Sequence, residues 1–250
     1  MPLTILILTG IKEELQGLLE RHPFEFEKEL RIYRSRKYRE LYARTTGPGV
    51  SKKGEIQKVL EDLAPDVVIC AGIAGILDEK DKVQTGDLLR IGAVIRQSNR
   101  VEYPGGPGRD RMITVDRPVH DILDKLDLAT EFKARACDME AAILLDMIGA
   151  LPALARKTYV IMLKIAGDRP EDSSLYEYEH HTWGWDRKSL WQKARTALSF
   201  PAGPVACIRL IRHKKSATQA LVRQMELLAF EIAKEQGVPP GMKSVFIPHR

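Results

Sequence analysis

The sequence has few cysteines and no long hydrophobic run, and each absence excludes a class of protein. Three cysteines, Cys70, Cys137 and Cys207, are scattered over 250 residues. They form no CxxC pair and have no histidine cluster beside them, which argues against a structural zinc site and a disulfide framework. No run approaches the roughly eighteen apolar residues of a membrane span, and the N-terminus lacks the pattern of a signal peptide. We therefore expect a cytoplasmic protein.

Positive charge is concentrated in the last third of the chain. Residues 1–175 contain 27 Lys and Arg against 28 Asp and Glu, whereas residues 176–250 contain 12 against 6. The stretch "PVACIRLIRHKK" mixes apolar and basic residues, which would suit an anionic membrane surface or a nucleic-acid backbone. A modest surplus of this kind is more often a solvated face. Peripheral membrane association therefore stands as an alternative, and a nucleic-acid partner is disfavoured.

Short apolar runs alternate with helical patterns. The runs have the length and β-branching of strands buried on both faces, and they cover Leu3–Leu8, Val67–Cys70, Leu88–Ile95 and Thr158–Ile165. The helical patterns cover Glu13–Arg21, Lys52–Leu63, Pro118–Leu126 and Met139–Ile148. This alternation predicts an α/β fold, with a mixed, mostly parallel central sheet flanked by helices.

The composition changes near residue 175. We expect residues 1–175 to form the α/β domain and residues 176–250 to form a helical, basic C-terminal extension packed on it. Within the last helical pattern an apolar stripe recurs every three to four residues, and it needs a partner surface. The stripe consists of Leu221, Met225, Leu228 and Ile232.

Ligands of open α/β sheets bind beyond the carboxyl ends of the strands. After the first strand, "LTGIKEEL" places Glu13 and Glu14 in a first helical turn, where the helix dipole favours carboxylates. The small residues of "AGIAG", over 71–75, open the next strand end to a ligand or to tight packing. The glycine turn over Thr45–Gly54 is a weaker example of the same feature.

Carboxylates follow two further apolar segments. Asp168 comes directly after "KIAG", where an acid is suited either to acid–base chemistry or to a turn. Asp138 and Glu140 precede the apolar helix "AAILLDM", with Asp138 expected as the N-cap and Glu140 in the first turn. Capping explains Asp138, but a partly buried Glu140 also needs hydrogen-bond partners.

These segments occur in an order that resembles the nucleoside phosphorylase superfamily, especially its nucleosidases and its hopanoid-associated phosphorylase-like members. "ILTGIKEEL" is similar to the opening strand and glutamate-rich turn of that family. "LAPDVVICAGIAGILDEKDKVQTGDLLRIGAVI" is similar to its Pro-Asp strand, glycine-rich loop and following "GD" strand. "ACDMEAA" resembles its Met-Glu motif, and "KIAGD" resembles the strand that ends in its catalytic aspartate. The resemblance covers residues 3–172.

The resemblance implies cleavage of the N-glycosidic bond of a purine-type nucleoside. It implies that Asp168 protonates the departing base, that Glu140 grips the ribose hydroxyls with Met139 against the sugar, and that Glu14 orients the attacking water. The glycine loop would line the sugar end with Gly72, Ile73, Ala74 and Gly75. No cofactor or metal is implied, although inorganic phosphate is an alternative co-substrate. A homo-oligomer is also expected.

The chain departs from the family pattern at several positions. Ile73 and Gly167 stand where nucleosidases often have serine, and Lys164 stands where an arginine is usual. No phosphate-binding arginine loop is found, which favours hydrolysis over phosphorolysis. The segment over 96–136 is shorter than in typical members, so base recognition is open. A second hypothesis is therefore a catalytically degenerate protein that binds a nucleoside as a sensor or scaffold.

Aromatic and histidine residues offer weaker candidates for the site. Tyr103, or Trp183 and Trp185 of the "TWGW" stretch, would suit stacking on a base, although packing is the commoner role of such residues. His180 and His181 are adjacent and point apart, so we expect no metal site there.

Overall fold

A computed structural model describes residues 2–77, 82–119, 121–169 and 203–237 of the chain. The expected domain boundary near residue 175, the "TWGW" tryptophans and the histidine pair of the C-terminal third lie outside these residues. Within the described ranges, no helix is both long and apolar enough to cross a membrane.

The centre of the structure is a set of parallel strands. β1 (Ile5–Thr9) pairs with β4 (Leu41–Thr45) on one side and with β5 (Val67–Ile76) on the other, and β5 pairs with β11 (Tyr159–Ala166) over eight residues. Alternate residues of β1 enter different hydrophobic clusters, because a strand turns successive side chains to opposite faces. The near-continuous apolar runs in the sequence follow from burial on both faces.

Shorter strands extend the sheet on either side, and the order is β2-β3-β4-β1-β5-β10-β9-β7-β8, with β11 and β6 beside β5. Their bounds are Phe24–Glu27 for β2, Ile32–Ser35 for β3, Leu88–Leu89 for β6, Ile91–Arg96 for β7, Glu102–Pro104 for β8, Asp110–Thr114 for β9 and Ala136–Asp138 for β10. Among the described strands, five ladders are parallel and five are antiparallel. The prediction of a mixed sheet flanked by helices is confirmed, and its longest ladder is parallel.

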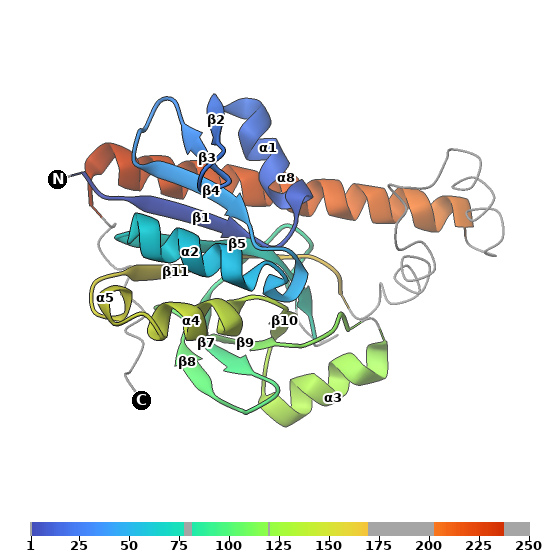
Figure 1. The fold of residues 1–250 in the computed structure, drawn as a ribbon. Coiled ribbons are helices and arrows are strands. Elements are labelled where there is room, and N and C mark those ends of the chain that lie inside the picture. Colours follow the sequence, from blue (N-terminus) through green and yellow to red (C-terminus); the bar gives the residue numbers. More distant parts are fainter. Residues whose placement is uncertain (1, 78–81, 120, 170–202, 238–250) are drawn as a thin grey trace.

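Helices cover both sides of this sheet (Figure 1). α1 (Lys12–Arg21) and α8 (Gly203–Glu235) pack on one side. On the other side lie α2 (Lys53–Leu63), the 3-10 turn η1 (Pro48–Val50), α4 (Ala141–Gly149) and α5 (Pro152–Ala155). α3 (Ile122–Phe132) packs on the smaller strands β7, β9 and β10.

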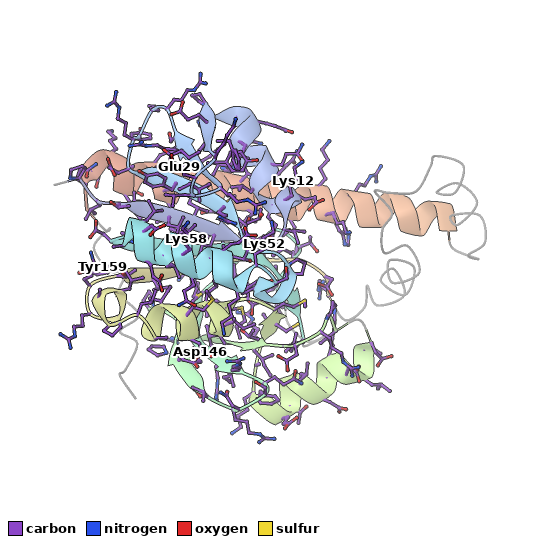
Figure 2. The ribbon with its side chains drawn as sticks, in the orientation of Figure 1. Lys12, Glu29, Lys52, Lys58, Asp146 and Tyr159 are labelled. Atoms are coloured by element: carbon purple, nitrogen blue, oxygen red, sulfur yellow. The ribbon has the colours of Figure 1, made fainter. Side chains whose placement is uncertain are left out.

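Two helices illustrate how burial follows the sequence pattern. The apolar stripe of α8 is buried against the side chains of β1, β5 and α1, so the surface that the stripe requires is the sheet face. On α2, Lys52 precedes the first turn and Lys58 lies on the exposed side (Figure 2), whereas Ile56, Val59 and Leu60 are buried.

Several expected element bounds were wrong. β5 does not end at Cys70 but continues to Ile76, because the small residues over 71–75 pair with β11 and β10 instead of forming a loop. The expected strand over 88–95 is divided into β6 and β7. α3 begins only at Ile122, because the side chain of Asp121 accepts from the backbone N–H groups of Leu123 and Asp124 and so caps the helix there.

Candidate functional site

Glu14 joins the ends of two central strands. It lies in the first turn of α1 and is buried, whereas its neighbour Glu13 is exposed. Its Oε2 accepts from the backbone N–H groups of Gly10 at 2.9 Å and Ile11 at 3.1 Å, and its Oε1 accepts from that of Ile73 at 2.8 Å. The carboxylate is thus fixed between the carboxyl end of β1 and the glycine-rich part of β5.

Lys164 of β11 and Asp138 of β10 form a buried ion pair. The Lys164 Nζ lies 2.7 Å from Asp138 Oδ2, and both side chains are almost fully enclosed. Thr114 donates its hydroxyl to Asp138 Oδ1 at 2.7 Å, and the backbone N–H of Ala141 donates to Oδ2 at 3.0 Å. Asp138 is therefore the last residue of β10, and its side chain reaches forward to the first residue of α4. The prediction that Asp138 is the N-cap of that helix was wrong.

Glu140, expected in the first turn of a helix, occupies the N-cap position of α4 but makes no side-chain cap. Its Oε1 instead accepts from the backbone N–H of Gly49 in η1 at 3.1 Å. A Cβ built on Gly10 would lie 3.1 Å from Glu140 Oε1 and 3.4 Å from Glu14 Oε2. The two glutamates therefore meet across Gly10, which has no side chain to separate them.

We call Glu14, Asp138, Glu140 and Lys164 the carboxylate cluster. It holds three carboxyl groups and one ammonium. Burial raises the pKa of Glu140 to about 7, and the nearby charge of Asp138 adds to this effect. Burial also raises the pKa of Glu14, against the hydrogen bond from Ile73 and the charge of Lys164. For Lys164, burial lowers the pKa, but the surrounding carboxylates outweigh burial and hold it above its ordinary value.

Asp168 belongs to a second polar group. Lys125 of α3 donates to Asp168 Oδ2, and the lysine side chain is fully buried whereas that of Asp168 is 18% exposed. The backbone carbonyl of Asp168 accepts from Ile76 N–H at 2.7 Å, which fixes the residue beside the end of β5. Among the described residues, no hydrogen bond or ion pair joins Asp168 to Glu14 or Glu140. We call this group the Asp168–Lys125 pair.

Two glycines of β5 make room for the two polar groups. A Cβ on Gly72 would lie 3.3 Å from both Glu14 Oε1 and Lys164 Nζ, and a Cβ on Gly75 would lie 3.0 Å from Asp168 Oδ1. The small residues therefore let polar side chains approach the strand itself.

Two departures from the family pattern depend on each other. A Cβ on Gly167 would lie only 2.4 Å from Cγ2 of Ile73, so the isoleucine occupies the space of any side chain at residue 167. The backbone of Gly167 still donates to the carbonyl of Ala74 at 2.8 Å. The bulkier residue on β5 and the glycine after β11 are thus a matched pair.

Tyr103 does not line either polar group. It is buried in the main core, where its hydroxyl donates to Asp146, the α4 residue labelled in Figure 2. Arg96 pairs with the same carboxylate. The tyrosine therefore ties α4 to the small strands, and packing, the commoner of the two roles considered for it, is the one that the structure shows.

The structure adds residues that the sequence alone did not single out. Gly49 contributes a backbone donor, and the methyl group of Met139 lies near it, 3.8 Å from where its Cβ would be. Lys125 was missed, although its spacing of three and seven residues from Leu128 and Phe132 on the buried side of α3 was a readable signal. In the described ranges, no group of His, Cys, Asp and Glu side chains has an arrangement that could hold a metal ion.

No protein-family model and no curated protein sequence matches the chain. Solved structures do match. Futalosine hydrolase of Helicobacter pylori superposes with a TM-score of 0.62 at 14% identity, covering 91% of this chain and 97% of that one. The 5'-methylthioadenosine nucleosidase of Arabidopsis thaliana gives a TM-score of 0.62 at 14% identity, with 95% and 97% covered.

A third match is the 5'-methylthioadenosine/S-adenosylhomocysteine nucleosidase of Neisseria meningitidis, in complex with methylthio-immucillin-A. Its TM-score is 0.61 at 12% identity, and the alignment covers 88% of this chain and 96% of that one. These likenesses extend over most of each chain and agree with the mixed sheet and its flanking helices. The chain therefore has the fold of the nucleosidases of the nucleoside phosphorylase superfamily.

Proposed function

We propose that this protein hydrolyses the N-glycosidic bond of a purine-type nucleoside. The observation that carries the proposal is the convergence of the Glu14 and Glu140 carboxyl groups across Gly10, at the carboxyl ends of β1 and β5. Paired carboxyl groups are what glycosidic cleavage uses, because the sugar becomes oxocarbenium-like as the bond breaks. A cluster with three carboxyl groups and one ammonium is suited to that developing positive charge.

Glu140 is the residue that we assign to the sugar. Its Oε1 is held by the backbone of Gly49, and the side chain is only partly buried, so its other oxygen is left for ribose hydroxyls. Met139 lies against the same turn and would pack on the sugar. The backbone N–H of Ile73 holds Glu14, and we assign the strand segment of Gly72, Ile73, Ala74 and Gly75 to the wall at the sugar end.

Water is the nucleophile that the charges favour over phosphate. Lys164 is already paired with Asp138, Lys125 with Asp168, and the Ile73 N–H with Glu14. An entering phosphate would meet surplus negative charge in the carboxylate cluster, whereas a water would find an acceptor in Glu14. We therefore assign Glu14 to orient the water and accept its proton, and no cofactor enters the reaction.

Asp168 is the residue that we assign to the departing base. It follows β11 at the carboxyl end of the sheet, and Gly75 lets its carboxylate lie against β5. A similar structure from Chlamydia trachomatis has MTA bound, and the Neisseria one holds methylthio-immucillin-A. A 5'-substituted adenine nucleoside is therefore the first substrate to test here, and a futalosine-like nucleoside is the second.

The test is a panel of purine nucleosides, incubated with and without inorganic phosphate and analysed by chromatography for free base. We expect release without phosphate. Asp168→Asn and Glu140→Gln should each abolish it, and Glu14→Gln should lower kcat on the order of 100-fold. The matched control is Glu13→Gln, the exposed neighbour, which should retain full activity. Full activity in Asp168→Asn would overturn the mechanism, and dependence on phosphate would make the protein a phosphorylase.

The pairing of Asp168 with Lys125 also favours a second function, a nucleoside-binding sensor or scaffold. In that case the same panel would give no free base, while calorimetry would show binding that Glu140→Gln removes. Homo-oligomer formation stays a prediction, and so does contact of the α8 surface around Arg212 and Lys215 with an anionic membrane.

A further inference from the structure

Lys125 lies where helix electrostatics disfavour a lysine. It is in the first turn of α3, close to the positive end of the helix dipole, which favours acids such as Asp121 and Asp124. Its side chain is fully buried on the apolar side of the helix that carries Leu128 and Phe132. Burial of an ammonium is costly unless a partner compensates it. Neither helix formation nor packing accounts for a lysine at this position.

The partner of the lysine is the carboxylate that the proposed function assigns to the departing base. Lys125 donates to Asp168 Oδ2, while Asp168 Oδ1 faces Gly75. Of the two side chains, only that of Asp168 has exposed surface, at 18%. A ligand therefore reaches Asp168 first, and the lysine lies behind it.

We infer that Lys125 is a positioning residue that also supplies the proton for the leaving base, through Asp168. This inference rests on the proposed function. In it, the C1'–N bond breaks and its electron pair passes to the base. A ring nitrogen of the base takes a proton from the Asp168 carboxyl group, and Asp168 takes that proton from Lys125. The pair is left as a neutral amine and a carboxylate.

The remaining protons balance through the carboxylate cluster. Water adds to C1' of the sugar, and its proton passes to Glu14. Solvent then takes the proton from Glu14 and returns one to Lys125, so the sum is nucleoside plus water giving sugar plus base. A lysine suits this relay better than an arginine, because an ammonium can release its proton whereas a guanidinium stays charged in proteins.

The test is Lys125→Arg, which keeps the positive charge beside Asp168 but removes the transferable proton. We expect kcat to fall on the order of 100-fold, with KM within about twofold of that of the wild type. The remaining activity should rise on acidification, because the proton for the base must then come from solvent. The control is Lys133→Arg, an exposed lysine at the end of the same helix, which should match the wild type.

A wild-type kcat and pH profile in Lys125→Arg would overturn the relay and leave the lysine as a fixed charge. Base release by the wild type would still support the proposed function in that case, so the two failures are distinguishable. Absence of base release from the wild type overturns both. If Lys125→Arg does not fold, Lys125→Gln decides, because glutamine still donates a hydrogen bond to Asp168 but holds no transferable proton. A fall in kcat that acidification partly restores supports the relay, and a wild-type kcat overturns it.

Discussion

Buried charge is compensated in different ways in the carboxylate cluster and in the Asp168–Lys125 pair. The pair matches one carboxylate with one ammonium. The cluster places Glu14, Asp138 and Glu140 around Lys164 alone, and backbone N–H groups supply much of the compensation. In the cluster, burial and the charge of Asp138 raise the pKa of Glu140 to about 7. In the pair, the two named groups carry one charge of each sign, whereas in the cluster the named carboxyl groups outnumber the ammonium, which is the feature that the proposed cleavage uses.

The largest effect on this comparison should come from Lys164→Met. Removing the ammonium leaves Asp138 and its neighbours as buried, uncompensated carboxylates, which typically costs about 3–5 kcal/mol. We expect the free energy of unfolding at pH 7.5, measured with urea, to fall by that amount, and the deficit to shrink in acid as the carboxylates take up protons. Lys157→Met, at an exposed site, is the control. A loss of less than about 1 kcal/mol would contradict the conclusion that Lys164 compensates the charge of the buried carboxylates.

The pH dependence of stability should come next in size. Because the folded protein holds the pKa of Glu140 above its ordinary value of 4.5, the folded state binds more protons than the unfolded state between about pH 4.5 and 7. Stability contributed by the neutral form is present in acid and is lost as pH rises through 7. Glu140→Gln should reduce this loss of unfolding free energy by about 2–3 kcal/mol. The value is smaller than the full pKa shift of Glu140 would give, because the group is partly exposed. Urea titrations of the wild type and of Glu140→Gln from pH 5 to 8 measure this difference. The same pH dependence of unfolding free energy in both proteins would contradict the prediction.

The matched pair Ile73 and Gly167 gives an intermediate effect. Gly167→Ala would place a Cβ 2.4 Å from Ile73 Cγ2 and should cost about 1–3 kcal/mol. Adding Ile73→Ala should recover most of the loss that the new methyl group causes. A double-mutant cycle in urea measures the coupling. Purely additive effects would show that the two positions are independent.

Gly75→Ala should have the smallest effect on stability and a selective effect on the Asp168–Lys125 pair. Its Cβ would lie 3.0 Å from Asp168 Oδ1, so the carboxylate must shift by a few tenths of an ångström. We expect kcat to fall about tenfold, because catalysis depends on the exact placement of such groups. Gly54→Ala is the control, since nothing lies within 4 Å of a Cβ at that helical position. An unchanged kcat in Gly75→Ala would show that the reaction does not depend on the placement of the Asp168 carboxylate.

The central strands and the first two helices were predictable because their patterns are strong. β1 and β11 are apolar on both faces, and α2 has a clear amphipathic pattern. The short strands were missed because sequences such as "FEFE" in β2 bury little and depend on their neighbours for pairing. The extension of β5 through Gly72 and Gly75 was missed because small residues indicate a turn as readily as a close approach.

The candidate residues could be named from the sequence, but their pairing could not. Glu14, Glu140 and Asp168 each stand at a strand end or helix start, a local feature that a sequence displays. Their partners come from distant segments, as Lys125 does for Asp168 and Gly49 for Glu140. Tertiary packing alone brings these groups together, so a single sequence cannot divide the acids into a cluster and a pair.

The most direct test of hydrolytic cleavage is to run the reaction in ¹⁸O-enriched water without phosphate. The masses of the released sugar and of the base are then measured by mass spectrometry. Hydrolysis predicts one ¹⁸O atom in the released sugar, at C1, and an unlabelled purine base. Label in the base with the glycosidic bond intact, or a requirement for phosphate with an unlabelled sugar, would contradict it.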